Sequence, residues 1–170
     1  MKGIDRRSAL LAIGATALCP IDMIAAVAAD YDDPAAKIIS VSGADGRTMT
    51  FSRDDIAALP QTRFETRAPW IETPAVFGGP SIADLIAAFA PGATFEQVEI
   101  VALDDYAVSA GVSDLIADGA ILAIRQNETF LPIANKGPAL MIFPFDDRPA
   151  LADKPHFGLC IWQISQIRFS

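Results

Sequence analysis

Apolar and polar positions alternate along most of the chain, which is the pattern of half-buried β-strands. Residues 37–51 alternate on both sides of Ala44-Asp45-Gly46, and this predicts a hairpin with a glycine-containing turn. The same period predicts further strands at 62–66, 98–102, 106–110, 120–124, 130–133, 139–145 and 160–168. The sequence therefore predicts many short strands joined by polar turns.

Helical patterns are few and short. Ser52 precedes RDDIAAL, with Asp55 three residues on, in the arrangement of a capping box. Ser81 is placed in the same way before residues 82–89, whose apolar positions fall on one helical face, so we expect this helix to lie on a sheet. A third helical piece is predicted at 113–115.

The mixture of many strands and two or three short helices predicts an α+β domain, mostly β, rather than a parallel βαβ protein. Residues 67–80 are expected to form an opening loop after the strand at 62–66. Residues 146–159 hold two prolines and no periodicity, which predicts a second, long loop. The chain has no Gly-x-Gly-x-x-Gly turn and no phosphate loop, so the common nucleotide-binding folds have no support.

Residues 1–29 have the anatomy of a secretory signal peptide: a positively charged start, an apolar run and an end rich in small residues. The apolar run is far shorter than the roughly 20 residues of a membrane-spanning helix. Arg6-Arg7 partly resembles a twin-arginine export signal, and the choice between the Sec route and the twin-arginine route stays open. An amphipathic N-terminal helix fits less well, because a proline and an aspartate interrupt the segment. We expect an exported, periplasmic protein whose residues 30–170 form one domain.

The charge balance argues against two classes of partner. The sequence has 13 lysines and arginines against 21 acids, a net charge of −8. Nucleic acids and anionic membrane surfaces reward clustered cations, so neither is expected to bind this chain. After residue 29 only Cys160 remains among the cysteines, so no internal disulfide is expected.

Few residues offer catalytic chemistry. His156 is the only histidine, which excludes most zinc sites and every mechanism that needs two histidines. In the predicted loop at 146–159 it could accept a proton or contact a ligand, but a solvated side chain is expected. No serine stands in a nucleophile-elbow context. The acid pairs at 104–105 and 146–147 fall in turns, where carboxylates are usually solvated.

Cations and aromatic residues cluster near predicted loops and strand ends. Guanidinium groups bind planar anions and stack on flat rings, so this set suits a flat, polar heterocycle. The alternative is that each cation pairs with a surface acid, and composition alone favours it. The residues concerned are Arg63, Arg67, Arg125, Lys136, Arg148, Trp70, Phe77, Tyr106 and Phe157.

Five segments in order resemble the small, exported members of the sulfite oxidase fold, which carry the oxidoreductase molybdopterin-binding domain. They are FSRDDIAALP, TRAPW followed by FGGPSIADLIAAF, VALDDYAVSAGVSDL, ILAIRQNETFLPIANKGPALMIFPF and CIWQISQIRF. The resemblance covers about residues 37–169. It implies a largely β domain that holds a pterin in a cleft.

One departure from this family bears on activity. Its catalytic members bind molybdenum through a cysteine thiolate, commonly four residues ahead of a tryptophan, whereas here Thr66 stands four residues before Trp70. A hydroxyl is a weak, hard ligand that cannot replace a soft thiolate. We therefore expect no catalytic residues, no metal site and no molybdenum. The resemblance to non-catalytic members implies a pterin-binding protein that regulates a membrane-bound cyclic-di-GMP enzyme through its periplasmic domain.

The resemblance also implies where a tetrahydropterin or a molybdopterin-like ligand would sit. The expected binding residues are Thr66, Arg67, Trp70, Asp105, Tyr106, Lys136 and Gly137. Trp70 or Tyr106 would stack on the ring, and Asp105 would accept hydrogen bonds from its amino and ring N–H groups. The alternative is a molybdopterin-dependent oxidoreductase, or a subunit of one, whose metal is held by the cofactor alone.

Overall fold

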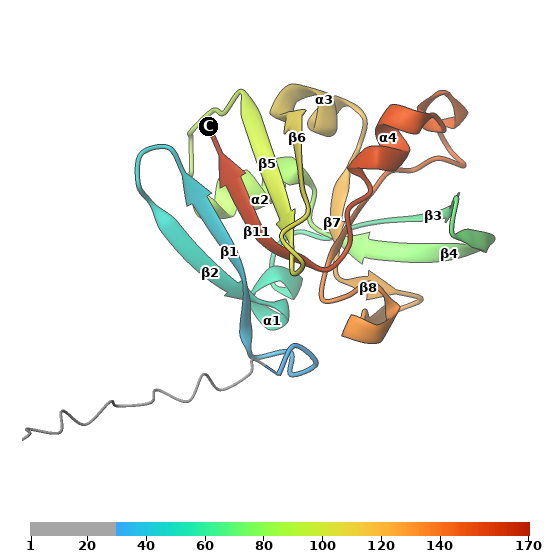
Figure 1. The fold of residues 1–170 in the computed structure, drawn as a ribbon, viewed down its shortest axis with the longest axis horizontal. Coiled ribbons are helices and arrows are strands. Elements are labelled where there is room, and N and C mark those ends of the chain that lie inside the picture. Colours follow the sequence, from blue (N-terminus) through green and yellow to red (C-terminus); the bar gives the residue numbers. More distant parts are fainter. Residues whose placement is uncertain (1–29) are drawn as a thin grey trace, which may run out of the picture.

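Eleven strands, four α-helices and two 3-10 turns follow one another along residues 30–170, which are the residues that the computed structural model describes (Figure 1). The predicted signal segment, residues 1–29, lies outside them. In this described part of the chain, no helix is both long and apolar enough to cross a membrane.

A five-stranded sheet forms one side of the molecule. Its strands are β1 (Lys37–Gly43), β2 (Thr48–Ser52), β5 (Gln97–Ala102), β6 (Ala107–Gly111) and β11 (Ile164–Phe169), in the order β2-β1-β11-β5-β6. The predicted hairpin β1–β2 is confirmed, and the strands predicted at 98–102 and 106–110 pair with each other as β5 and β6. The terminal strand β11 pairs in parallel with β1 and antiparallel with β5, so the two ends of the described chain meet in the middle of this sheet.

The remaining strands form a second group, which Figure 1 shows to one side of the first sheet. Its strands are β3 (Thr62–Ala68), β4 (Ile71–Gly79), β8 (Arg125–Gln126) and β9 (Thr129–Phe130) in one sheet, with β7 (Ile121–Ala123) and β10 (Leu140–Ile142) paired in another. The predicted opening loop at 67–80 is therefore wrong, because most of it is β4. Pro74 is tolerated since β4 pairs with β8 only at Phe77 and Gly78, which leaves that side of Pro74 unpaired.

The helices are α1 (Arg53–Ala57), α2 (Ile82–Phe89), α3 (Val112–Ala117) and α4 (Lys154–Leu159), with 3-10 turns η1 (Ile133–Asn135) and η2 (Pro149–Leu151). The three predicted helices are confirmed as α1, α2 and α3, and only α4 was not predicted. The capping box of α1 is confirmed: the Ser52 hydroxyl accepts from the Asp55 backbone N–H at 3.0 Å. Phe89 of α2 stacks on Phe169 of β11 with centroids 6.1 Å apart, so α2 lies on a sheet as predicted.

The predicted long loop at 146–159 is partly wrong, because it contains η2 and α4. The Asp153 side chain caps α4 by accepting from the His156 backbone N–H at 3.0 Å, and a proline in the first turn loses no helical hydrogen bond. The last strand also differs from prediction. It begins at Ile164 rather than at residue 160, since Gln163 has a left-handed φ of 54° that breaks the extended run.

Candidate functional site

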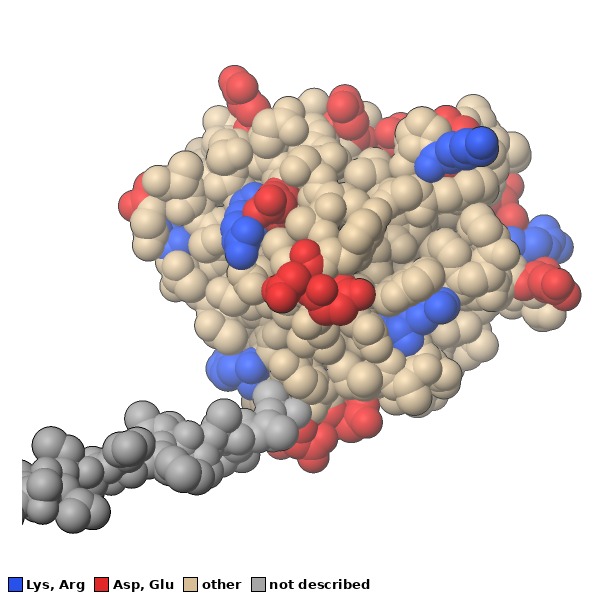
Figure 2. Space-filling model, viewed as in Figure 1, with Lys and Arg blue, Asp and Glu red and all other residues tan. Residues whose placement is uncertain are grey.

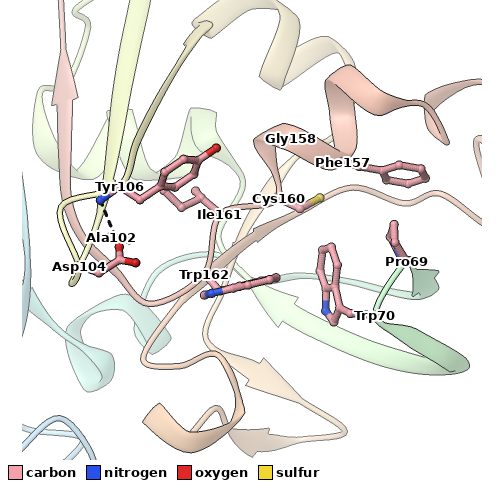
Figure 3. A pocket seen from close by; sticks show the side chains of 10 residues that line it. All are labelled: Pro69, Trp70, Ala102, Asp104, Tyr106, Phe157, Gly158, Cys160, Ile161 and Trp162. Carbon is pink, nitrogen blue, oxygen red and sulfur yellow. Dashed lines mark hydrogen bonds between the residues drawn. The ribbon is translucent and has the colours of Figure 1, made fainter.

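A hollow of about 470 Å³ opens where β5–β6, the β3–β4 turn and the segment after α4 come together. We call it the tryptophan hollow (Figure 3). It is lined by Pro69 and Trp70, by Ala102, Asp104 and Tyr106, and by Phe157, Gly158, Cys160, Ile161 and Trp162.

Aromatic rings make up most of its wall. Trp70 and Trp162 meet edge to face, with centroids 5.4 Å apart and planes 79° apart. Tyr106 and Trp162 are 57% and 40% exposed, so flat faces remain open to a ligand. Figure 3 shows Tyr106 on one side of the hollow, Trp70 and Phe157 on the other, and Trp162 between Tyr106 and Trp70. Such a wall suits a flat ring, which can stack on it.

Asp104 supplies the charged group of the tryptophan hollow. One of its oxygens accepts from the backbone N–H of Tyr106 at 3.1 Å, a bond that fixes the β5–β6 turn. The side chain is exposed, and Figure 2 shows acidic side chains gathered over this turn. The neighbouring Asp105, one of the expected binding residues, has a left-handed φ of 66° and does not line the hollow.

Cys160 also lines the tryptophan hollow but is only 4% exposed. Burial raises the pKa of its thiol to about 12, and a hydrogen bond with the Phe143 backbone offsets only part of this rise. The side chain is therefore a neutral thiol at physiological pH, which makes it a weak nucleophile and a poor metal ligand.

Of the seven binding residues expected from the sequence, Trp70 and Tyr106 line the tryptophan hollow. Arg67 lines an adjoining hollow of about 590 Å³, which shares Pro69 and Phe157 with the first. Its guanidinium pairs with Asp146 at 3.2 Å, as the alternative of surface ion pairs predicts.

Thr66 lines neither of these two hollows, because its side chain is completely buried. Its hydroxyl donates to the Arg67 carbonyl at 3.1 Å and accepts from the Asp146 backbone N–H at 3.2 Å. These bonds tie β3 to the segment after β10. The position that resembles a metal-ligand position therefore holds a fully bonded structural hydroxyl.

Lys136 and Gly137 do not line the tryptophan hollow. The Lys136 ammonium is 3.8 Å from the centroid of the Trp162 ring and 5.8 Å from that of Trp70. At Gly137, an added Cβ would lie 2.0 Å from the Leu131 carbonyl oxygen. This glycine is thus required by a close approach of two backbone segments, and ligand binding is not needed to explain it.

Asp104 and Trp162 also line the tryptophan hollow, and neither was among the expected binding residues. Phe157, one of the aromatic residues expected near a loop, lines it from α4. Trp162 falls within an alternating run that was assigned to the last strand, where an aromatic residue usually packs inward. The break at Gln163 leaves it before the strand instead, with its ring at the hollow. Only the left-handed residue marks this break, and its side chain gives no sequence signal.

His156 connects two helices at the edge of the site. Its Nδ1 lies 2.7 Å from an Asp153 oxygen and its Nε2 lies 3.2 Å from an Asp118 oxygen, just after α3. Burial acts to lower the pKa of His156, but hydrogen bonds with Asp153 and Asp118 and the charges of these carboxylates raise it above its usual value. The prediction of a solvated loop histidine is therefore wrong, because the side chain is only 20% exposed and belongs to α4.

Comparisons with known proteins give a likeness of structure alone. No family model matches the chain, and no curated protein matches it. Among solved structures it is similar to the sulfane dehydrogenase SoxCD from Paracoccus pantotrophus, with a TM-score of 0.58 and 12% identity over 78% of this chain. The match covers 37% of the SoxCD chain, so this protein spans little more than a third of its length. At this identity the likeness shows the fold alone, and it supports a distant sulfite-oxidase-like fold.

Proposed function

We propose that this protein binds a pterin in the tryptophan hollow and does no redox chemistry on it. The observation that carries the proposal is an aromatic hollow of about 470 Å³ with one exposed carboxylate at its edge. Flat heterocycles bind such sites by stacking, while a few placed polar groups fix their orientation.

A pterin matches the polar group of this hollow as well as its aromatic wall. The pyrimidine ring of a pterin presents an amino group and a ring N–H side by side. The Asp104 carboxylate can accept from both, because only one of its oxygens is engaged by the Tyr106 backbone. Trp162 or Tyr106 would then stack on the ring. Asp104 thus takes the role expected of Asp105.

The complete molybdopterin cofactor fits this hollow poorly. It carries a phosphate, yet the described residues that line the hollow include one carboxylate and neither lysine nor arginine. It also carries a metal, and the nearby Cys160 thiol has a pKa of about 12. Within residues 30–170, no group of three or more histidine, cysteine, aspartate or glutamate side chains could hold a metal ion. We therefore derive no reaction step through that cofactor.

The most direct test is to identify what the protein carries. Protein purified from its host should release a fluorescent pterin on denaturation, and mass spectrometry should identify it in near-stoichiometric amount. Protein that emerges empty should bind added tetrahydropterin. An empty protein that fails to bind would overturn the proposal. Stoichiometric molybdenum in the same sample would instead support the oxidoreductase alternative, which the likeness to SoxCD favours only weakly.

We further propose that the protein is exported and acts by contacting the periplasmic part of a membrane-bound cyclic-di-GMP enzyme. This step rests on the sequence resemblance and on the signal-like residues 1–29. Fractionation of cells that express the tagged full chain tests export, and a shortened protein in the periplasm is expected. Loss of a cyclic-di-GMP response when the protein is deleted tests the partner, and an unchanged response would contradict it.

A further inference from the structure

A second hollow of about 350 Å³ shares Trp70 with the tryptophan hollow, and we call it the lysine hollow. It is lined by Trp70 and Ile71 of the β3–β4 hairpin, by Gln126 of β8, by Asn135 and Lys136 at the end of η1, and by two aliphatic residues. We infer that it binds the carboxylate group of a small organic acid. This inference does not depend on the pterin proposal.

The first reason is an indole N–H without a partner. Trp70 Nε1 is buried and makes no hydrogen bond with any described residue. A buried donor left unsatisfied costs about 1–3 kcal/mol, so such groups usually have a partner. In Figure 3 the nitrogen edge of Trp70 lies on the side of the ring away from Phe157 and Cys160. Trp70 lines both hollows, so we assign the missing acceptor to the lysine hollow. The nitrogen is closed to solvent in this structure, so a ligand oxygen reaches it only after a side chain that lines the lysine hollow moves aside.

The second reason is that Lys136 lacks a carboxylate partner among the described residues. Most cations of the described chain pair with carboxylates: Lys37, Arg47, Arg63, Arg67, Arg148 and Arg168. Lys136 has no such partner in residues 30–170, although the chain has an excess of acids. Its ammonium is instead held over the Trp162 ring, beside Trp70. A fixed cation and a free N–H donor thus lie at the same hollow.

These donors select the class of ligand. A carboxylate has two oxygens, one for the Lys136 ammonium and one for the Trp70 N–H, and the Gln126 and Asn135 amides can donate to the remaining lone pairs. Lys136 is the one lysine or arginine that lines this hollow, and the whole chain has a net charge of −8. This charge balance favours a monoanion over a doubly charged phosphate. We expect weak binding, in the millimolar range for a simple carboxylate.

NMR of the two indole N–H resonances tests this site, because the sequence has only two tryptophans. A Trp162→Phe variant assigns them. Sodium acetate is titrated in place of sodium chloride, so that the ionic strength stays constant. Acetate should shift the Trp70 resonance saturably. Chloride and phosphate should bind no more tightly than acetate. Lys136→Met should weaken acetate binding about tenfold, and Lys136→Arg should retain it.

Lys154→Met is the matched control, since Lys154 is an exposed lysine of α4 that does not line the lysine hollow. It should bind acetate as the unmodified protein does. The inference is wrong if acetate causes no saturable shift, if phosphate binds more tightly, or if Lys136→Met binds acetate equally well. Pterin binding is measured at the other hollow, so its failure would leave this result intact.

Discussion

At the scale of single residues, the ionisation of His156 affects the helix that borders the tryptophan hollow. It lies between two carboxylates, Asp153 on its own helix and Asp118 at the end of α3, and Arg148 pairs with Asp118 from behind. Its ring also packs edge-on against Phe143, at 5.3 Å between centroids. A protonated ring donates to both carboxylates, whereas a neutral ring has one N–H only. Protonation therefore stabilises the contact between α4 and the end of α3. Helix α4 carries Phe157 and Gly158, which line the tryptophan hollow.

This arrangement predicts a pH-dependent stability. Because the folded-state pKa of His156 is raised, its contribution is fully present below the unfolded pKa of about 6.5 and is lost as pH rises through the folded value. His156→Gln should lower the melting temperature by roughly 2 °C at pH 5.5, a small effect because solvent screens a partly exposed ion pair. By pH 8.5 the difference should shrink. Thermal melts of both proteins across this range check the prediction, and a constant difference would refute it.

At the scale of elements, two parts of the loop between β9 and β10 pack so closely that Gly137 has no space for a side chain. An added Cβ there would lie 2.0 Å from the Leu131 carbonyl oxygen, a backbone atom that cannot move aside alone. Gly137→Ala should therefore lower the free energy of unfolding by about 3 kcal/mol or more. Urea denaturation measures this change.

Gly158 provides the contrasting position for the same measurement. It lies within α4, and a Cβ added there would meet nothing within 4 Å. Gly158→Ala should raise the free energy of unfolding by about 0.5 kcal/mol, because alanine loses less backbone entropy in a helix. Equal effects of the two substitutions would show that the β9–β10 loop is looser than the structure indicates.

The elements also show what the sequence could predict. Alternation identified β1, β2, β5 and β6, and the serine caps identified α1 and α2, because these signals are local. The parallel pairing of β1 with β11 could not be predicted, since alternation does not specify a partner. Strand β4 was missed because Pro74 resembles a strand breaker, and α4 was missed because its cap, Asp153, lies among prolines.

At the scale of the whole molecule, the candidate site is formed by segments that lie far apart in the sequence, and no local pattern predicts that they meet. Trp70 and Tyr106 could be picked from the sequence because both are aromatic residues next to turns. Trp162 could not, since its place depends on a single left-handed residue after it. Asp104 and Asp105 are indistinguishable in sequence, and the turn conformation decides which one faces the hollow.

The central claim is that a flat heterocycle binds between these segments, and calorimetric titration with tetrahydropterin tests it most directly. Four proteins are compared: the unmodified chain, Trp162→Ala, Asp104→Asn, and the control Glu65→Gln, an exposed acid of β3 outside the tryptophan hollow. Loss of one stacked ring or of one charged acceptor should each weaken binding about tenfold or more, and the control should bind normally. Absence of binding by the unmodified chain, or equal affinity in all four proteins, would contradict the account.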